Sequence, residues 1–404
     1  MSEYQYYEFQ ALDRRLTEAE MVELQKLSSR VNLTSNRAVF VYNYGDFRGT
    51  PEAVLEKYFD AMLYLTNWGT RQLMFRFPKQ LLNIEAIEHY CIEGAITLET
   101  SAKYATLNIS IHNEDSAGWV DEDEGEEGLD RMIPLRNAIL QGDYRALYFA
   151  WLRVCELQFG TGSNLDLEDK DEAETASDDD TLGEYDAYAL LELSSPEPPI
   201  PPNLKDLDDA LKAFVEFFEI NPLWIAVGTA NSPVVVKAKE PFEQWIAALP
   251  EPECRRLLLR AAQDESNIGL YIRTELRKRF AVAAPLSPTA GKTRTVAQLL
   301  AVVQENIKRE TEERQKQAEQ ARLKRLKELA QQEPTLWKEV MVAIQQKNSK
   351  GYDQAVSLLS KLRELAESRG EQIGFKVRVE QIYNQFPTLS SLRSRMISAG
   401  LIKR

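Results

Sequence analysis

Histidine and cysteine, the side chains from which many catalytic and metal sites are built, are scarce in this chain. Its 404 residues include two histidines, His89 and His112, and three cysteines without any C-x-x-C spacing, Cys91, Cys155 and Cys254. A His-rich metal site or a Cys-His catalytic pair would have to use nearly all of them from distant positions. The sequence therefore gives no catalytic, cofactor-binding or metal-binding residue, and it favours a protein that is not an enzyme and needs no cofactor.

Long apolar segments are missing as well. No run of about 18 apolar residues occurs, and charged residues are already frequent within the first 20 positions. A signal-peptide core does not tolerate such charges. The widely spaced cysteines fit a reducing compartment. We therefore expect a cytoplasmic protein with no membrane partner.

Charge is distributed unevenly along the chain. Residues 1 to 200 hold 38 acidic and 16 basic residues, whereas residues 201 to 404 hold 25 acidic and 33 basic residues. The two halves therefore have opposite net charge, and each could attract a different partner.

The first 162 residues have the pattern of an α+β domain. Thr17 with Glu20 three positions later forms a capping box, and Pro51 suits the first turn of a helix expected to reach Thr66. The expected strands are residues 4–12, 38–44, 71–77, 95–100 and 104–111, and the expected helices are 17–28, 51–66, 84–90, 129–140 and 143–159. This order combines crossovers with a hairpin, so we expect a mixed sheet of about five strands.

The remainder of the chain divides by composition into four segments. Residues 163–202 combine an acidic block with a Pro-rich exit and are expected to be a linker. Residues 203–282 have the pattern of a helical bundle, 283–334 that of a linker and a long charged helix, and 335–404 that of a C-terminal helical hairpin domain. The charged helix lacks apolar residues between Ile307 and Ala318, which excludes a continuous coiled-coil seam there.

The C-terminal hairpin is similar to one tetratricopeptide (TPR) repeat. Its sequence Gly351-Tyr352-Asp353-Gln354-Ala355, followed by leucines, resembles the second helix of that repeat. One hairpin is not a solenoid, which needs about three repeats. Helical packing unrelated to peptide binding is the alternative.

Two charged regions suggest ligands. The loop 114–130 holds nine carboxylates but lacks the EF-hand spacing, so a solvated loop, weak divalent-cation binding and attraction of a basic partner all remain open. Residues 251–404 hold 29 basic against 18 acidic residues, which makes nucleic acid a possible partner. Against this, basic residues alternate with glutamates and few aromatic residues lie among them.

Most of the chain resembles a widespread family of bacterial proteins of unassigned function. The resemblance is carried by the runs YEFQALDR at 7–14, YGDF at 44–47, YFDA at 58–61, NWGTR at 67–71 and WIAALPE at 245–251. The last 50 or so residues also resemble the tails of bacterial SWIM zinc-finger proteins, without their C-x-C…C-x-H zinc pattern. These resemblances imply no activity.

One set of polar and aromatic residues flanks the ends of the second and third expected strands. Loops at strand ends often bear binding sites. The candidate interaction cluster comprises Tyr44, Asp46, Arg48, Asn67, Trp68 and Arg71. The alternative is structural, with Trp68 capping the core and Arg71 paired with Asp46 or Asp60.

Together these features favour a non-catalytic adaptor that binds another protein, in a pathway and an oligomeric state that the sequence does not fix. A nucleic-acid-associated factor acting through the basic half, or an enzyme with an unrecognised site around Asp46 and Arg71, are the alternatives.

Overall fold

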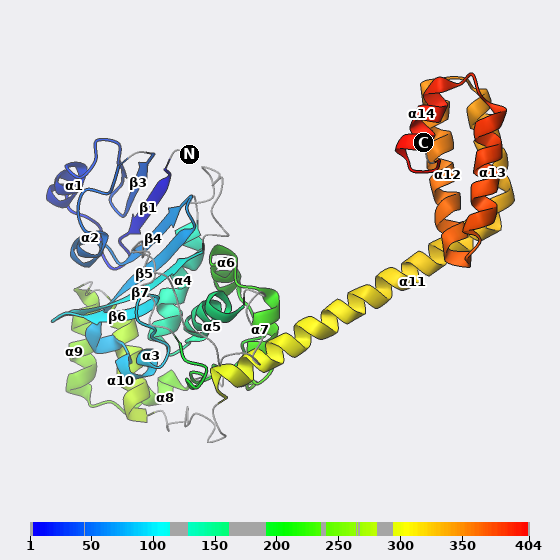
Figure 1. The fold of residues 1–404 in the computed structure, drawn as a ribbon. Helices are drawn as coiled ribbons and strands as arrows, with labels where there is room; N and C mark the ends of the chain where they lie inside the picture. The colour runs from blue at the N-terminus through cyan, green and yellow to red at the C-terminus, as the bar shows by residue number, and fades with distance from the viewer. Residues whose placement is uncertain are drawn as a thin grey trace, which may run out of the picture. The chain divides into compact units, whose positions relative to one another are not determined.

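The computed structural model describes residues 3–43, 45–113, 128–160, 191–235, 240–263, 265, 267–280 and 294–402. Two compact units divide the chain, Met1–Glu305 and Asn306–Arg404. The first contains a sheet and the second is helical (Figure 1). The prediction of an α+β region followed by a helical C-terminal half is therefore confirmed. Among the residues described, no helix is both long and apolar enough to cross a membrane.

Seven strands form a single sheet with the order β2-β3-β1-β4-β5-β7-β6. Every strand pair in it is antiparallel. The strands are β1 (Gln5–Gln10), β2 (Asn32–Leu33), β3 (Arg37–Tyr42), β4 (Ala61–Thr66), β5 (Thr70–Pro78), β6 (Ile96–Thr100) and β7 (Tyr104–His112). The prediction of a mixed sheet of about five strands is wrong, because the sheet also contains β2 and β4 and no pair of the strands described is parallel.

Strand β4 was mistaken for the end of a helix because both of its faces are buried. Ala61, Leu63 and Leu65 lie in the core on one face of the sheet, while Met62 lies in the core on the other. A strand buried on both faces reads as a continuous apolar run, without the alternation that distinguishes a strand from a helix. The preceding helix α2 (Pro51–Tyr58) ends where Phe59 adopts an extended conformation, at φ −127° and ψ 174°.

Helices α1 (Glu18–Gln25) and α2 cover one face of the sheet around β3, β1 and β4. Thr17 caps α1 by accepting a hydrogen bond from the Glu20 backbone, and the Glu20 side chain accepts one from the Thr17 backbone, so the predicted capping box is confirmed. Phe9 and Phe40 of the strands meet Phe59 and Leu55 in this smaller core.

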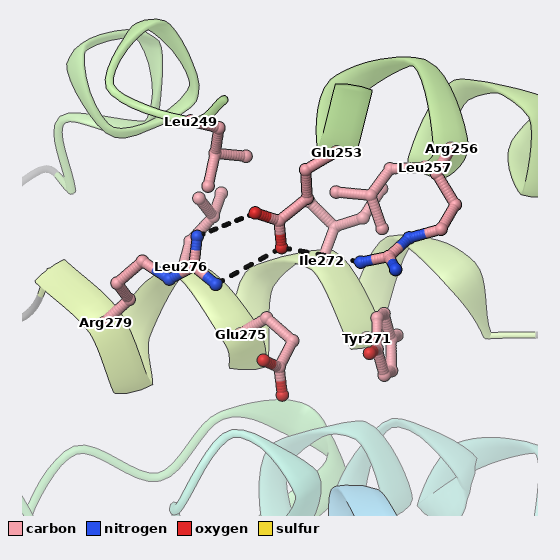
Figure 2. A pocket seen from close by; sticks show the side chains of 9 residues that line it. All are labelled: Leu249, Glu253, Arg256, Leu257, Tyr271, Ile272, Glu275, Leu276 and Arg279. Carbon is pink, nitrogen blue, oxygen red and sulfur yellow. Dashed lines mark hydrogen bonds and ion pairs between the residues drawn. The ribbon is translucent and has the colours of Figure 1, made fainter. Parts of the chain in front are cut away.

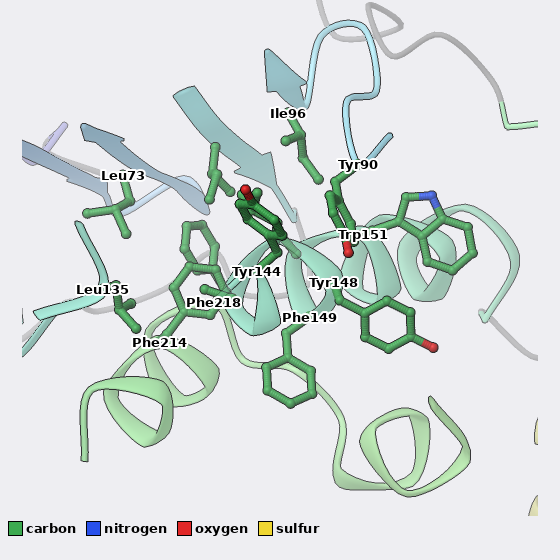
Figure 3. Packing of buried hydrophobic residues seen from close by; sticks show 14 of the residues in the cluster. Leu73, Tyr90, Ile96, Leu135, Tyr144, Tyr148, Phe149, Trp151, Phe214 and Phe218 are labelled. Atoms are coloured by element: carbon green, nitrogen blue, oxygen red, sulfur yellow. The ribbon is translucent and has the colours of Figure 1, made fainter. Parts of the chain in front are cut away.

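The larger core lies on the other face of the sheet. It includes side chains from α3 (Ile84–Glu88), α4 (Gly128–Leu140), α5 (Arg145–Phe159), α6 (Asp209–Phe217) and α7 (Pro222–Thr229). Figure 3 shows Tyr148, Phe149 and Trp151 of α5 in the same cluster as Phe214 and Phe218 and as Leu73 and Ile96 of the sheet. The sequence assigns α6 and α7 to a separate bundle at 203–282, but these helices share the core of the sheet.

A clasp, defined here as residues 191–197 with 294–297, joins the start of α11 (Val296–Gln345) to this core. Backbone hydrogen bonds link Glu197 N to Arg294 O at 2.8 Å and Val296 N to Ser195 O at 3.0 Å. The buried Glu197 carboxylate accepts two hydrogen bonds from Arg294, at 2.8 and 2.7 Å, and one from the Tyr148 hydroxyl at 2.5 Å. Val296, Leu299, Leu300 and Val303 then lie in the core. The first turns of α11 are thus part of the first unit.

Helices α8 (Phe242–Ala247), α9 (Glu251–Ala262) and α10 (Ile268–Phe280) pack more loosely. Of their side chains, only Leu257 and Leu276 are fully buried among the residues described. Figure 2 shows a gap between α9 and α10 in which the Glu253 carboxylate binds Arg279 and Arg256. The gap has a volume of about 10 Å³. This is room for about one water molecule and far too small for an organic ligand.

The second unit has its own core, formed by α11, α12 (Ser349–Arg369), α13 (Gln372–Gln385) and α14 (Ser390–Ser398). The boundary expected at residues 334 and 335, between the charged helix and the C-terminal hairpin domain, lies inside α11, which continues through Pro334. Gly351 permits the close approach of α12 to the end of α11, because a Cβ atom there would lie 2.4 Å from the Ala343 carbonyl oxygen. The similarity of this unit to a TPR repeat stays a prediction.

Candidate functional site at one end of the sheet

Strand β1 brings the two parts of the candidate interaction cluster together. Gln5, at the start of β1, lies opposite Tyr42 of β3 and Thr66 of β4. The loop that follows β3 and the turn between β4 and β5 therefore lie at the same end of the sheet. Asp46 belongs to that loop and Asn67 to that turn.

Hydrogen bonds from the start of β1 hold both segments. The Tyr4 backbone N–H donates to Asn67 Oδ1 at 2.9 Å. The Gln5 side-chain amide donates to the Gly45 carbonyl at 3.2 Å and to Asp46 Oδ1 at 3.5 Å. Gly45 and Gly69 have φ values of 84° and 93°, which favour glycine. Both segments therefore turn tightly at a glycine.

Two tyrosines support Gln5 from within the smaller core. The hydroxyl groups of Tyr7 and Tyr64 both donate to Gln5 Oε1, at 2.9 and 3.3 Å. Their rings are stacked with centroids 4.3 Å apart. Burial raises the pKa of Tyr7 above its ordinary value, so this hydroxyl stays protonated and remains a donor at neutral pH. The Gln5 side chain is thus fixed in orientation.

The other members of the cluster are less closely connected. Arg48 is exposed, Trp68 is half-buried, and Tyr44 lies outside the described residues. Arg71 forms an ion pair with Glu219 at 2.7 Å and lies over the Phe217 ring at 5.6 Å. Arg71 therefore contacts the end of α6.

Sequence reasoning did not place His112 at this site. Thr70 lies opposite His112 in the pairing of β5 with β7, and Thr70 Oγ1 is 3.0 Å from His112 Nδ1. The imidazole thus joins the same end of the sheet as Asn67, Trp68 and Asp46. In the sequence, the only indication is that His112 stands at the end of an alternating strand. The pairing of β5 with β7 places this strand end at the same end of the sheet as the candidate cluster.

Chemically, this end of the sheet offers a carboxylate, a carboxamide, an imidazole and an indole. Such groups can hydrogen-bond and stack with a partner surface. Over the ranges that the structure describes, no group of three His, Cys, Asp or Glu side chains is arranged to hold a metal ion. Most of the acidic loop, residues 114–127, lies outside those ranges, so the suggestion of a divalent cation there stays a prediction.

A second set of polar residues, the Asp60 cluster, consists of the buried Asp60, Arg76 and Arg136 and the partly buried Asp13. Asp60 Oδ2 accepts hydrogen bonds from the backbone N–H groups of Leu12 and Asp13, at 2.7 and 2.9 Å. Asp60 Oδ1 accepts from Arg76 Nη2 at 2.7 Å and lies 3.7 Å from Arg136 Nη2. The Asp13 carboxylate binds Arg136 through two hydrogen bonds of 2.9 Å.

Electrostatics explain why this buried carboxylate stays charged. Burial alone would raise the pKa of Asp60, but the guanidinium groups of Arg136 and Arg76 outweigh it and hold the pKa below its usual value. Asp13 and Asp60 come from the YEFQALDR and YFDA runs on which the bacterial family resemblance rests. In this structure, those two carboxylates join β1, β4, β5 and α4.

Comparison with known proteins adds no relative: no protein-family model, no curated protein and no solved structure matches this chain. The resemblance to a bacterial family of unassigned function stays a prediction.

Proposed function

We propose that this chain is a non-catalytic adaptor that binds another protein through its C-terminal helical unit. The observation that carries the proposal is the exposed apolar pair on α13. Ile373 is 80% exposed and Val377 is 50% exposed, one helical turn apart. The opposite face of α13, with Phe375, Val379 and Ile382, lies in the core.

An apolar pair spaced by four residues is typical of helix-in-groove recognition, in which such residues act as anchors. Burying an isoleucine or valine side chain contributes roughly 1.5–3 kcal/mol. Gly374 beside the pair would let a partner approach the helix backbone closely, because no atom lies within 4 Å of the position of an added Cβ there. These features support a helical or groove-forming protein partner.

Affinity purification of the full chain tests the proposal. We expect a stoichiometric partner to be recovered with the natural sequence and lost in the double variant Ile373→Ser, Val377→Ser. The matched control is Leu258→Ser, Leu259→Ser on α9, whose leucines are 69% and 59% exposed in the first unit. This control should retain the partner.

A truncation gives an independent readout, provided that it begins at residue 306. Val296, Leu299, Leu300 and Val303 belong to the core of the first unit, so an earlier cut would damage that unit as well. Recovery of the bare protein from the natural sequence, or a partner retained after loss of residues 306–404, would contradict the proposal.

A further inference from the structure

A line of cations follows one face of α11 within the second unit. At 3.6 residues per turn, one face is visited every three or four positions. We define the α11 stripe by eight positions of one face, Arg309, Glu313, Lys316, Gln320, Lys324, Lys327, Gln331 and Lys338, with Pro334 on the same face between the last two. It contains five cations against one carboxylate. At 1.5 Å per residue the stripe is about 44 Å long.

The cations of the stripe form no close ion pair with neighbouring side chains in the described part of this unit, although Glu313 lies among them. All eight positions are exposed. Some basic residues elsewhere in this unit have acidic partners, as Arg325 has Glu364 at 3.3 Å and Arg369 has Glu333 at 2.8 Å, whereas others, such as Lys350 and Lys361, have none among the residues described. Within residues 306–402, which the structure describes without a gap, no ion pair involves any of the five cations of the stripe.

The composition of the stripe distinguishes between classes of anionic partner. A helix that lies on a membrane needs an apolar face, and protein interfaces usually have an apolar centre. None of the eight positions has an aliphatic or aromatic side chain, although Pro334 lies among them and the exposed Leu323 lies on their flank. A linear series of cations interleaved with glutamines instead suits a linear polyanion, since lysine, arginine and glutamine all donate hydrogen bonds to phosphate oxygens.

We infer that the α11 stripe binds the phosphate backbone of double-stranded nucleic acid, independently of base sequence. The two strands of a duplex carry one negative charge per roughly 1.7 Å of axis, so a stripe of this length faces several phosphates along one side. Each neutralised phosphate releases condensed counterions and contributes about 0.9 to the slope of log affinity against log salt. This activity is separate from the protein partner proposed for α13.

The test uses the full chain and fluorescein-labelled duplexes of DNA and of RNA, each about 25 base pairs long, roughly twice the length of the stripe. Binding is measured by fluorescence anisotropy at about 50 and 200 mM NaCl, a range over which phosphate contacts are strongly salt-dependent. The variant is Lys324→Gln, Lys327→Gln, Lys338→Gln. The control, Lys350→Gln, Lys361→Gln, Lys376→Gln, makes the same change of charge at exposed positions of the same unit away from the stripe.

We expect the stripe variant to lose roughly tenfold or more in affinity and about 3 from the salt slope, while the control keeps most of both. A preference for DNA or RNA would show which duplex geometry fits the stripe. Three results would each overturn the inference. They are equal losses of affinity in the two variants, no duplex binding by the natural sequence at the lower salt concentration, and binding to phosphatidylserine vesicles in place of both duplexes. The α13 variant should bind the duplexes normally, so failure of either proposal is distinguishable from failure of the other.

Discussion

Replacing Asp60 by asparagine should destabilise the first unit strongly. Asp60 is 1% exposed, and its two oxygens accept from backbone N–H groups on one side and Arg76 on the other. Asparagine has one acceptor oxygen, so its NH₂ group must point at donors. Breaking a buried ion pair on one side costs about 3–5 kcal/mol because the remaining charge stays buried. At about 2 °C per kcal/mol for a unit of this size, the melting temperature should fall by roughly 6–10 °C.

The assay is thermal unfolding followed by circular dichroism, with Asp46→Asn as the matched control. Asp46 is exposed and its carboxylate makes one long hydrogen bond of 3.5 Å to Gln5, so this variant should stay within about 0.5 kcal/mol of the natural protein. Equal melting temperatures for Asp60→Asn and Asp46→Asn at pH 7 would refute the reasoning.

Acid gives the same prediction a second readout. The pKa of Asp60 is lower in the folded protein than its usual value, so the stabilisation by its charge is fully present above the unfolded pKa of about 4. It is lost as the pH falls through the lower folded value. The difference in stability between the natural protein and Asp60→Asn should therefore be constant from pH 5 to pH 8 and shrink below about pH 4. A difference that persists unchanged at lower pH would mean that the cost arises from packing rather than from charge.

Three further predictions follow from local contacts. Gly228→Ala should destabilise the first unit by about 1–3 kcal/mol, because the new Cβ would lie 2.6 Å from a leucine side chain. The control is Gly269→Ala in α10, where the new Cβ meets nothing within 4 Å, so this variant should be neutral or stabilising. Chemical denaturation of both variants measures the difference. Glu197→Gln should leave Arg294 without its buried charge partner and loosen the clasp. Limited proteolysis should then cleave the chain faster near residues 294–305. An unchanged cleavage rate would argue against the clasp. Burial raises the pKa of Cys91 to about 11. Alkylation of this thiol by iodoacetamide should therefore be slow at pH 7 and become faster as the pH rises. Rapid labelling at pH 7 would contradict this prediction.

Local sequence signals predicted the elements whose causes are local. The capping box at Thr17 and Glu20 was found because both partners lie within one helical turn. Strand β4 was missed because burial on both faces removes its alternation, and β2 was missed because it has only two residues. The parallel pairs implied by a mixed sheet were wrong because strand pairing is a long-range property that the order of elements does not fix.

For the candidate site too, the sequence predicted local features but not the long-range arrangement. The sequence placed Asp46 and Asn67 near strand ends, but their common location depends on β1 lying between β3 and β4. One partner of Arg71 is Glu219, 148 positions away in sequence. The sequence had suggested Asp46 or Asp60 for this role. Charge complementarity predicts that an arginine has an acidic partner, but the partner is chosen by the packing of α6, which the sequence assigned to another domain.

The structural roles of the motif residues Asp13 and Asp60 indicate which parts of the molecule are available to bind a partner. A motif with acidic and basic residues invites a search for chemistry, yet Asp60 accepts four hydrogen bonds inside the fold and Asp13 accepts two from Arg136. A carboxylate in that setting cannot bind a ligand without leaving buried donors unsatisfied, at a cost of about 1–3 kcal/mol for each. Recognition is far less costly at exposed groups that have no internal partner. The α13 pair and the α11 stripe meet that condition, one through apolar surface and the other through charge, and both lie in the second unit. In the first unit, the motif residues Asp13 and Asp60 stabilise the fold. The surfaces of the second unit are therefore the better place to look for partners.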